Sequence, residues 1–151
     1  MSDVEAKVTW VKGLEFSCLS SRGVKTLMDG DGLAAANPVE ILLEALGVCG
    51  AIDVVTILEK QRTPLRRMEI QMSGDRNSTQ PRYFTRAIAR FDLWGEGITE
   101  AKAAKVLELS YVKYCTVYQS LRPDLEFSVE FRIHGTDSSV SGEYLPVSLK
   151  Q

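Results

Sequence analysis

The sequence predicts a single domain of mixed helices and strands, and three observations indicate this fold class. Residues 4–28 alternate between apolar and polar residues as strands do, residues 38–61 carry apolar residues around most of a helix, and residues 65–94 have the pattern of a hairpin. The chain has 151 residues, of which 44% are hydrophobic and 25% are charged, as is usual for a globular protein. We therefore expect one domain over residues 1–151.

The first expected element is a three-stranded meander. Its strands lie at residues 4–10, 14–18 and 24–28, where apolar side chains recur at every second position. Gly13 and the Ser-Ser-Arg-Gly segment at residues 20–23 supply turn residues between these strands.

A helix is expected from Pro38 to about Gln61. Asn37 is a good N-cap residue, and proline is well suited to the first helical position. Apolar residues cover most of the helix circumference, which predicts a central helix with protein around it. These residues are Ile41, Leu42, Ala45, Leu46, Cys49, Ile52, Val55 and Ile57.

The second half of the chain continues with strands and one more helix. Two strands at residues 65–72 and 82–94 are joined by a polar loop, and Thr99 can cap a helix that runs to about Ser120. Residues 127–133 alternate as a last strand. The Ser- and Gly-rich tail after this strand is weakly specified.

The charge balance does not favour binding to nucleic acid or to an anionic membrane. The chain has 18 Lys and Arg residues against 20 Asp and Glu residues, which gives a net charge of −2. The most apolar run, residues 41–58, contains Glu44 and Asp53, which are costly in hydrocarbon. We therefore expect a buried helix of a soluble protein, with neither nucleic acid nor a membrane as a partner.

Three cysteines and one histidine limit the metal chemistry that is open to the chain. Zinc sites usually need about four N or S ligands at spacings such as Cys-x-x-Cys, which do not occur, so we expect no metal and no cofactor. The odd cysteine count and the polar N-terminal segment favour a reducing compartment, and we expect a cytoplasmic protein. His134 stands next to Gly135 at a strand end, and we expect a solvated or hydrogen-bonded residue there rather than a catalytic one.

The three cysteines leave two interpretations open. Cys49 has Gly47 and Gly50 close by in the first helix, and each glycine costs about 1 kcal/mol relative to alanine. Either close packing against the glycines offsets this cost and Cys49 is an inert thiol, or the glycines leave room for a substrate beside the sulfur. Cys115 lies in the second helix, and its sulfur can meet that of Cys49 only if the two helices cross there. Cys18 is expected to be a packing residue on a strand.

Three segments carry a distinctive set of motifs. They are Asn-Pro-Val-Glu-Ile-Leu-Leu at residues 37–43, Ala-Leu-Gly-Val-Cys at residues 45–49 and Lys-Tyr-Cys-Thr-Val at residues 113–117. Together they resemble the osmotically inducible protein C and organic hydroperoxide resistance (OsmC/Ohr) superfamily, and residues 50–60 look like an uncharacterised bacterial OsmC-like branch of it. The resemblance implies an α+β, OsmC-like fold, in which two long central helices pack against curved antiparallel sheets in an intertwined homodimer.

The resemblance also implies a chemistry. It assigns the peroxidatic role to Cys49 and the resolving role to Cys115, so that a Cys49 thiolate attacks a hydroperoxide and the resulting sulfenic acid condenses with Cys115 to a disulfide. The expected partners are a small-molecule hydroperoxide and a dithiol reductant, such as a lipoyl protein or a thioredoxin-like protein. The expected function is a thiol-dependent peroxidase in oxidative stress defence.

One part of the family pattern differs in this chain. The family activates its cysteine with an arginine from the N-terminal strands, held by a glutamate directly after the helix-start proline. Here Val39 follows Pro38, and Glu40 comes one residue later, about 100° further around the helix. Arg22 lies in the right region for the arginine. Arg22 and Glu40 are therefore candidates beside the two cysteines.

A second function class stays open because of this difference. In the first, the chain is a cysteine peroxidase for organic hydroperoxides and possibly hydrogen peroxide. In the second, it is a catalytically weak dimeric protein that binds small molecules or is associated with stress, because a fold hosts functions without dictating them.

Overall fold

The computed structural model describes residues 2–135 and 142–150. The chain forms two compact units, Met1–Leu42 and Leu43–Gln151, and each is described by itself. The mixed class of helices and strands is confirmed. The single domain over the whole chain stays a prediction.

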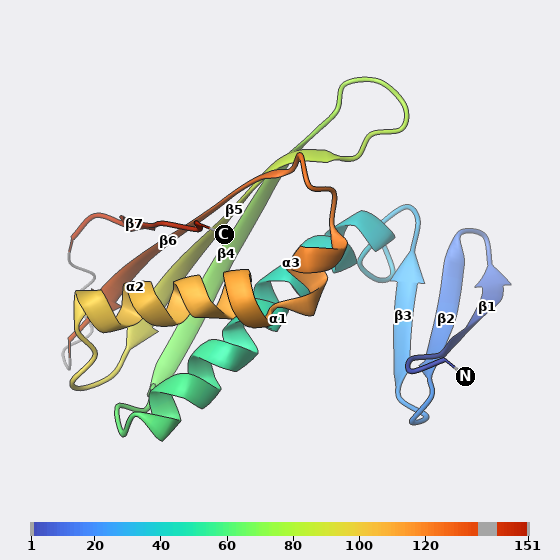
Figure 1. Cartoon of the computed structure of the whole chain (residues 1–151). Coiled ribbons are helices and arrows are strands. Elements are labelled where there is room, and N and C mark those ends of the chain that lie inside the picture. The colour runs from blue at the N-terminus through green and yellow to red at the C-terminus, as the bar shows by residue number, and fades with distance from the viewer. Residues whose placement is uncertain (1, 136–141, 151) are drawn as a thin grey trace. The chain divides into compact units, whose positions relative to one another are not determined.

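The first unit contains the predicted meander. Strands β1 (Ala6–Lys12), β2 (Glu15–Ser20) and β3 (Lys25–Asp29) form an antiparallel sheet in that order (Figure 1). The turns between them use Gly13 and Gly23 with φ of 52° and 81°, a left-handed conformation that glycine adopts without the cost of a Cβ.

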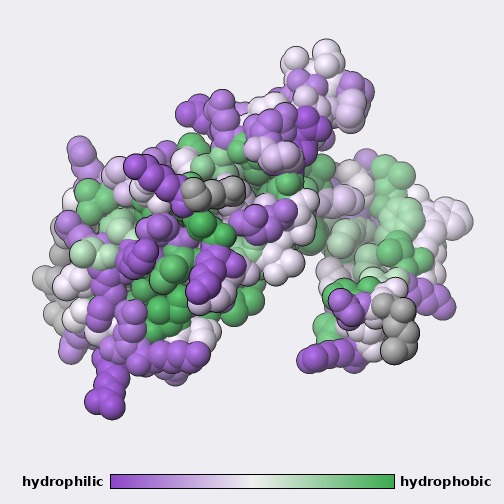
Figure 2. Space-filling model, in the orientation of Figure 1, coloured by the Kyte–Doolittle hydropathy of each residue, from purple (hydrophilic) through white to green (hydrophobic). Residues whose placement is uncertain are grey.

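The meander exposes most of its apolar side chains. Among residues 2–42 only Asp29 is buried, whereas Trp10 is 65% exposed and Leu27 is 54% exposed. Figure 2 shows apolar residues on the surface of this unit. The sheet therefore gains its order from backbone hydrogen bonds and turns, with little apolar burial within the chain.

Asp29 closes the meander through its carboxylate. Its two oxygens accept hydrogen bonds from the backbone N–H groups of Ala34 (2.9 Å), Asp31 (3.1 Å) and Leu33 (3.1 Å). These donors, Ala34 first, hold the pKa of Asp29 below its ordinary value. The loop before the first helix is ordered by this one side chain.

Helix α1 spans Pro38–Lys60, close to the predicted range. One side of the helix is buried within the chain and the other is not. The buried residues are Leu46, Gly47, Gly50, Ala51, Val54 and Leu58. Val48 is 57% exposed, Ile52 60% and Val55 44%. The helix is long and apolar enough to span a membrane, but Glu44 and Asp53 interrupt its apolar run and a third of that run is buried in the protein.

The second unit has a four-stranded sheet in the order β4-β5-β6-β7. The predicted hairpin is formed by β4 (Arg67–Arg76) and β5 (Phe84–Trp94), and the predicted last strand is β6 (Glu126–His134). The sheet is not wholly antiparallel as expected, because β5 and β6 run parallel, with the helical segment as the connection between them. The short strand β7 (Leu145–Val147) lies in the tail, where the sequence predicts no element.

The second helix is interrupted, whereas the sequence predicts one continuous helix. Thr99 caps α2 (Glu100–Leu109), as predicted, by accepting a hydrogen bond from the N–H of Lys102 at 3.2 Å. A π-helical turn, η1 (Ser110–Tyr114), follows, and after Cys115 the short helix α3 (Thr116–Ser120) begins. A π-turn inserts one residue into the helical repeat and often marks a functional site.

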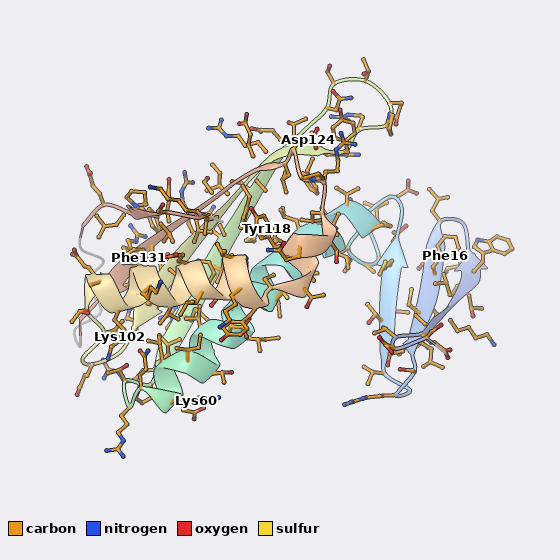
Figure 3. All side chains as sticks on the ribbon, in the orientation of Figure 1. Phe16, Lys60, Lys102, Tyr118, Asp124 and Phe131 are labelled. Atoms are coloured by element: carbon orange, nitrogen blue, oxygen red, sulfur yellow. The ribbon has the colours of Figure 1, made fainter. Side chains whose placement is uncertain are left out.

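Helices α1 and α2 cross on the same face of the four-stranded sheet (Figures 1 and 3). In β5, every second residue points into the core between helices and sheet: Ala87, Ala89, Phe91 and Leu93. Residues between them, such as Arg90 and Asp92, lie on the opposite face. This packing holds the middle of α1, which carries Cys49, near η1, which Cys115 follows.

Candidate active site around Cys49 and Cys115

Cys49 is half-buried in the middle of α1, and both nearby glycines are explained by packing. A Cβ at Gly50 would lie 2.2 Å from Cζ of Tyr111, and a Cβ at Gly47 would lie 3.0 Å from the side chain of Met72. Of the two interpretations that the sequence leaves open for these glycines, the structure favours close packing. Cys49 itself remains accessible in part, so close packing around the glycines does not make it a core thiol.

Cys115 is fully buried at the break between η1 and α3. Its backbone N–H donates to the carbonyl of Ser110 at 2.7 Å, which closes the π-turn. Its sulfur accepts a hydrogen bond from the N–H of Tyr118 at 3.4 Å and so caps α3. The sulfur is thus fixed by the backbone on both sides of the residue.

Both thiols are free, and Cys49 is one of the neighbours that shift the pKa of Cys115, so the two side chains lie near each other. Burial raises the pKa of Cys115 well above its ordinary value, and the adjacent Cys49 raises it further, while the Tyr118 N–H acts in the opposite direction. Cys115 is therefore protonated at neutral pH. The two helical segments do meet where the sequence required, as the hydrogen bond between Tyr111 and Leu46 shows, and a disulfide between Cys49 and Cys115 stays a prediction.

Tyr111 is a member of this site that the sequence analysis did not identify. It is fully buried, its hydroxyl donates to the carbonyl oxygen of Leu46 at 3.2 Å, and its ring covers Gly50. Burial raises the pKa of Tyr111, and the neighbouring Cys115 and Cys49 raise it further, so the phenol stays protonated. The sequence signal at this point is Gly50 itself, because its cost in a helix interior calls for a reason such as close packing.

Arg22 and Glu40 belong to the first unit. Arg22 is an exposed residue of the β2–β3 turn. Glu40 and Asn37 form a capping box: the Asn37 Oδ1 accepts from the Glu40 N–H at 2.9 Å, and the Glu40 carboxylate accepts from the Asn37 N–H at 3.0 Å. The capping box accounts for Glu40 structurally, and the catalytic roles of both residues stay predictions. Cys18 is half-buried in β2, opposite Val8 and Thr26.

His134 lies in a second polar cluster, on the sheet face away from the helices. Its Nε2 is 2.7 Å from Oδ1 of Asp92, and its ring stacks on Trp94 with centroids 4.3 Å apart. Asp92 also accepts hydrogen bonds from Arg132 and from the hydroxyl of Tyr144 (2.7 Å). The expectation of a hydrogen-bonded histidine is confirmed, and the parallel register of β5 and β6 supplies its partner.

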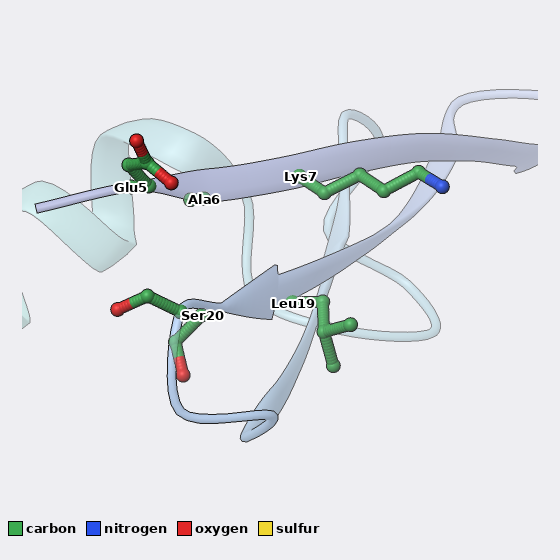
Figure 4. Close-up of a pocket in the computed structure, with 6 residues that line it drawn as sticks. Glu5, Ala6, Lys7, Leu19 and Ser20 are labelled. Atoms are coloured by element: carbon green, nitrogen blue, oxygen red, sulfur yellow. The ribbon is translucent and has the colours of Figure 1, made fainter.

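The described surface includes two small hollows among others. One, of about 260 Å³, lies beside α3 and is lined by Tyr118, Gln119, Leu121, Arg122, Pro123 and Leu125. The other, of about 200 Å³, lies on the meander between β1 and β2 and is lined by Glu5, Ala6, Lys7, Leu19, Ser20 and Ser21 (Figure 4). Within residues 2–135 and 142–150, no group of three or more His, Cys, Asp or Glu side chains could hold a metal ion.

Comparison with known proteins adds the family context. The family model described as OsmC-like protein matches residues 29–130. Protein YhfA from Escherichia coli strain K12 is 36% identical over 131 residues, which cover 86% of this chain and 98% of the relative.

Two solved structures illustrate the fold. A hypothetical protein from Aquifex aeolicus VF5 superposes with a TM-score of 0.81 at 23% identity, over 91% of this chain and all of the other. The organic hydroperoxide resistance protein OhrB of Bacillus subtilis superposes with a TM-score of 0.58 at 14% identity, over 87% and 98% of the two chains. At these identities the likeness establishes a shared fold.

Proposed function

The chain belongs to the OsmC-like protein family, whose model matches well over half of its length, and from this premise we propose that it is a thiol-dependent peroxidase for organic hydroperoxides. The observation that carries the proposal is the pair of free, adjacent thiols, one partly accessible and one buried. This asymmetry suits a two-step cycle, because the attacking sulfur needs access to substrate and the second sulfur needs only to reach the first.

The proposed cycle assigns one role to each cysteine. The Cys49 thiolate attacks the outer oxygen of the hydroperoxide, the O–O bond breaks, and the alkoxide leaves and takes a proton to become the alcohol. The Cys49 sulfenic acid then reacts with Cys115: an S–S bond forms and the hydroxyl leaves with the Cys115 proton as water. A dithiol reductant, of the lipoyl or thioredoxin-like kind, restores two thiols and becomes oxidised to its own disulfide.

The ionisation of Cys115 supports this assignment. A thiol whose pKa is raised by burial keeps its proton, and a protonated Cys115 cannot compete with Cys49 for the peroxide. The same proton is available to leave with the sulfenic hydroxyl in the second step. Arg22 is the proposed cation that favours the Cys49 thiolate, and Glu40, one position later than the family glutamate, is the candidate carboxylate that would hold the arginine.

Two fold neighbours support hydroperoxides as the substrate class. OhrB of Bacillus subtilis and a protein from Elizabethkingia anophelis are both described as organic hydroperoxide resistance proteins. Free thiols also suit a reducing compartment, and we place the protein in the cytoplasm. Exposed apolar residues on α1 and on the meander support a homodimer as the working form.

The deciding experiment is peroxide consumption by the pre-reduced protein, with cumene hydroperoxide and hydrogen peroxide compared, followed by intact mass. Wild type is expected to consume cumene hydroperoxide and to lose two hydrogens per chain. Cys49→Ser is expected to abolish consumption. Cys115→Ser is expected to consume about one equivalent and to stop at oxidised Cys49. Cys18→Ser is the matched control and is expected to behave as wild type.

The opposite outcome has a clear meaning. Thiols that remain reduced in excess cumene hydroperoxide would contradict the peroxidase proposal. The alternative, a catalytically weak small-molecule-binding or stress-associated protein, would then account for Val39 at the position where the family has glutamate. Selective loss of consumption in Arg22→Ala, with the fold intact, is the outcome expected if Arg22 activates Cys49.

A further inference from the structure

Tyr111 connects the two helical segments that carry the cysteines. Its hydroxyl donates to the Leu46 carbonyl of α1 at 3.2 Å, and its ring atoms lie within 2.2 to 2.6 Å of the place that a Gly50 Cβ would occupy. Leu46 and Gly50 lie three residues before and one residue after Cys49. Tyr111 is therefore attached to the single turn of α1 that positions the Cys49 sulfur.

The backbone between Tyr111 and Cys115 is held rigidly by side-chain and backbone hydrogen bonds. The Cys115 N–H donates to the Ser110 carbonyl at 2.7 Å, and Nε2 of Gln119 donates to the Val112 carbonyl at 3.1 Å. Ser110 in turn donates its hydroxyl to the carbonyl of Val106 at 2.8 Å. A displacement of the Tyr111 side chain relative to α1 would therefore displace Cys115 as well.

The Tyr111 ring itself has little freedom to move. It packs edge-on against Phe127, Phe91 and Tyr118, with centroid distances of 4.9, 6.2 and 6.2 Å. Edge-to-face aromatic pairs add to the energy of burial and favour one orientation of the ring. The Tyr111 ring packed on Gly50 and the Tyr111 hydroxyl bound to Leu46 thus fix the distance between the two cysteine-bearing segments.

We propose that Tyr111 is a positioning residue that sets the approach of the Cys49 and Cys115 sulfurs and so favours disulfide closure. The role of Tyr111 in the peroxide cycle rests on the proposed function, whereas its effect on the two sulfurs can be tested without any peroxide. Tyr111 acts through its hydrogen bond to α1 and touches neither the peroxide nor a proton in transfer.

The test is the thiol–disulfide equilibrium of the full chain in buffers of reduced and oxidised dithiothreitol. In this exchange the protein dithiol becomes a disulfide while the oxidised reagent takes up two electrons and two protons. Tyr111→Phe removes only the hydroxyl, and loss of one buried hydrogen bond is expected to lower the effective concentration of the two thiols about two- to tenfold. Tyr114→Phe, at an exposed tyrosine next to Cys115, is the matched control and is expected to match wild type.

A second measurement, the free energy of unfolding of the reduced and of the oxidised protein, separates positioning from a merely structural role. A structural role would lower the free energy of unfolding of the reduced and oxidised proteins equally and leave the effective concentration unchanged. Under peroxide, Tyr111→Phe is expected to form the Cys49 sulfenic acid at the wild-type rate and to accumulate more sulfinic acid, because closure is slower.

Failure of the inference and failure of the proposed function look different. An effective concentration for Tyr111→Phe equal to that of wild type, or a wild type that forms no disulfide with oxidised dithiothreitol, overturns the positioning role. A third outcome separates the two: wild type forms the disulfide, Tyr111→Phe forms it less readily, and wild type consumes no hydroperoxide. That outcome supports the positioning role and overturns the peroxidase proposal.

Discussion

Gly50 shows how a missing side chain shapes the candidate site. The Tyr111 ring occupies the space above it, and the ring is wedged among three other aromatic side chains. At Gly47 the neighbour is the flexible end of Met72 instead. The two glycines of α1 thus make room for different side chains: the rigid Tyr111 ring at Gly50 and the flexible Met72 side chain at Gly47.

This difference predicts opposite effects of the same substitution. Gly50→Ala is expected to lower the free energy of unfolding by up to about 2 kcal/mol, since overpacking a rigid neighbour costs about 1–3 kcal/mol and the gain in helix propensity returns only roughly 1 kcal/mol. Gly47→Ala is expected to be neutral or slightly stabilising. Urea unfolding of both variants checks the pair, and a Gly50→Ala protein as stable as Gly47→Ala would contradict the packing argument.

The sequence could predict Cys49 and Cys115 but could not predict Tyr111. The cysteines stand in recognisable motifs, whereas Tyr111 acquires its role from contact with Leu46, which lies 65 residues earlier. The local sequence shows that a glycine at position 50 is costly in a helix. Only the crossing of the helices shows that the Tyr111 ring requires it. For the same reason, the sequence alone leaves open whether the two glycines serve close packing or access of a substrate to Cys49.

At the scale of elements, the parallel register of β5 and β6 brings Asp92 beside Arg132 and His134. The sequence predicted both strands, but strand direction and register depend on long-range pairing, so the partner of His134 could not be foreseen. The π-turn before Cys115 was likewise missed, because the residues of η1 have the same apolar spacing as an α-helix.

The Asp92 cluster predicts an acid dependence of stability. Burial alone would raise the pKa of Asp92, but hydrogen bonds from Arg132, His134 and Tyr144 more than offset this and lower it. The carboxylate therefore stabilises the fold above its ordinary pKa of about 3.9, and this contribution is lost as the pH falls through the lowered pKa. Asp92→Asn is expected to cost about 1–3 kcal/mol at neutral pH and to flatten the decline below about pH 4, measured by urea unfolding. If the free energy of unfolding of Asp92→Asn falls with acid as steeply as that of wild type, the role assigned to the Asp92 carboxylate is contradicted.

The start of α1 offers a test of the two roles considered for Glu40. Glutamine also serves in a capping box, so Glu40→Gln is expected to leave the free energy of unfolding within about 0.5 kcal/mol of wild type, and its rate of peroxide consumption separates the two roles. Asn37→Ala removes the cap itself and is expected to cost about 1 kcal/mol. A stable Glu40→Gln protein that has lost activity would show that the carboxylate charge is needed for catalysis.

At the scale of the whole molecule, one face of α1 is apolar and exposed. The sequence predicts a helix surrounded by protein, and within one chain the structure covers only one side of it. A patch of this kind on a soluble protein usually marks an interface. An apolar pattern around the whole helix is what the proposed homodimer would require.

The homodimer proposal predicts the effect of a charge on this face. Ile52 is 60% exposed, and Ile52→Lys is expected to convert a species of twice 16.8 kDa into one of 16.8 kDa, because burying an unpaired ammonium against apolar residues is costly. Ser78→Lys adds the same charge on the exposed β4–β5 loop and is the control. Light scattering after gel filtration gives both masses, and a wild-type mass of 16.8 kDa would contradict the proposal.

The meander has a consequence for how the chain is made. Residues 2–42 leave the ribosome before the second unit, and their antiparallel strands are joined by short turns, so their pairing needs no later segment. Yet the sheet buries no apolar side chain at that stage, since Asp29 is the only buried residue among residues 2–42 even when residues 43–135 and 142–150 are present. A nascent chain would therefore present an ordered but uncovered strand edge for the time needed to synthesise the rest. Aggregation during synthesis, rather than loss of native stability, is the hazard that this architecture carries.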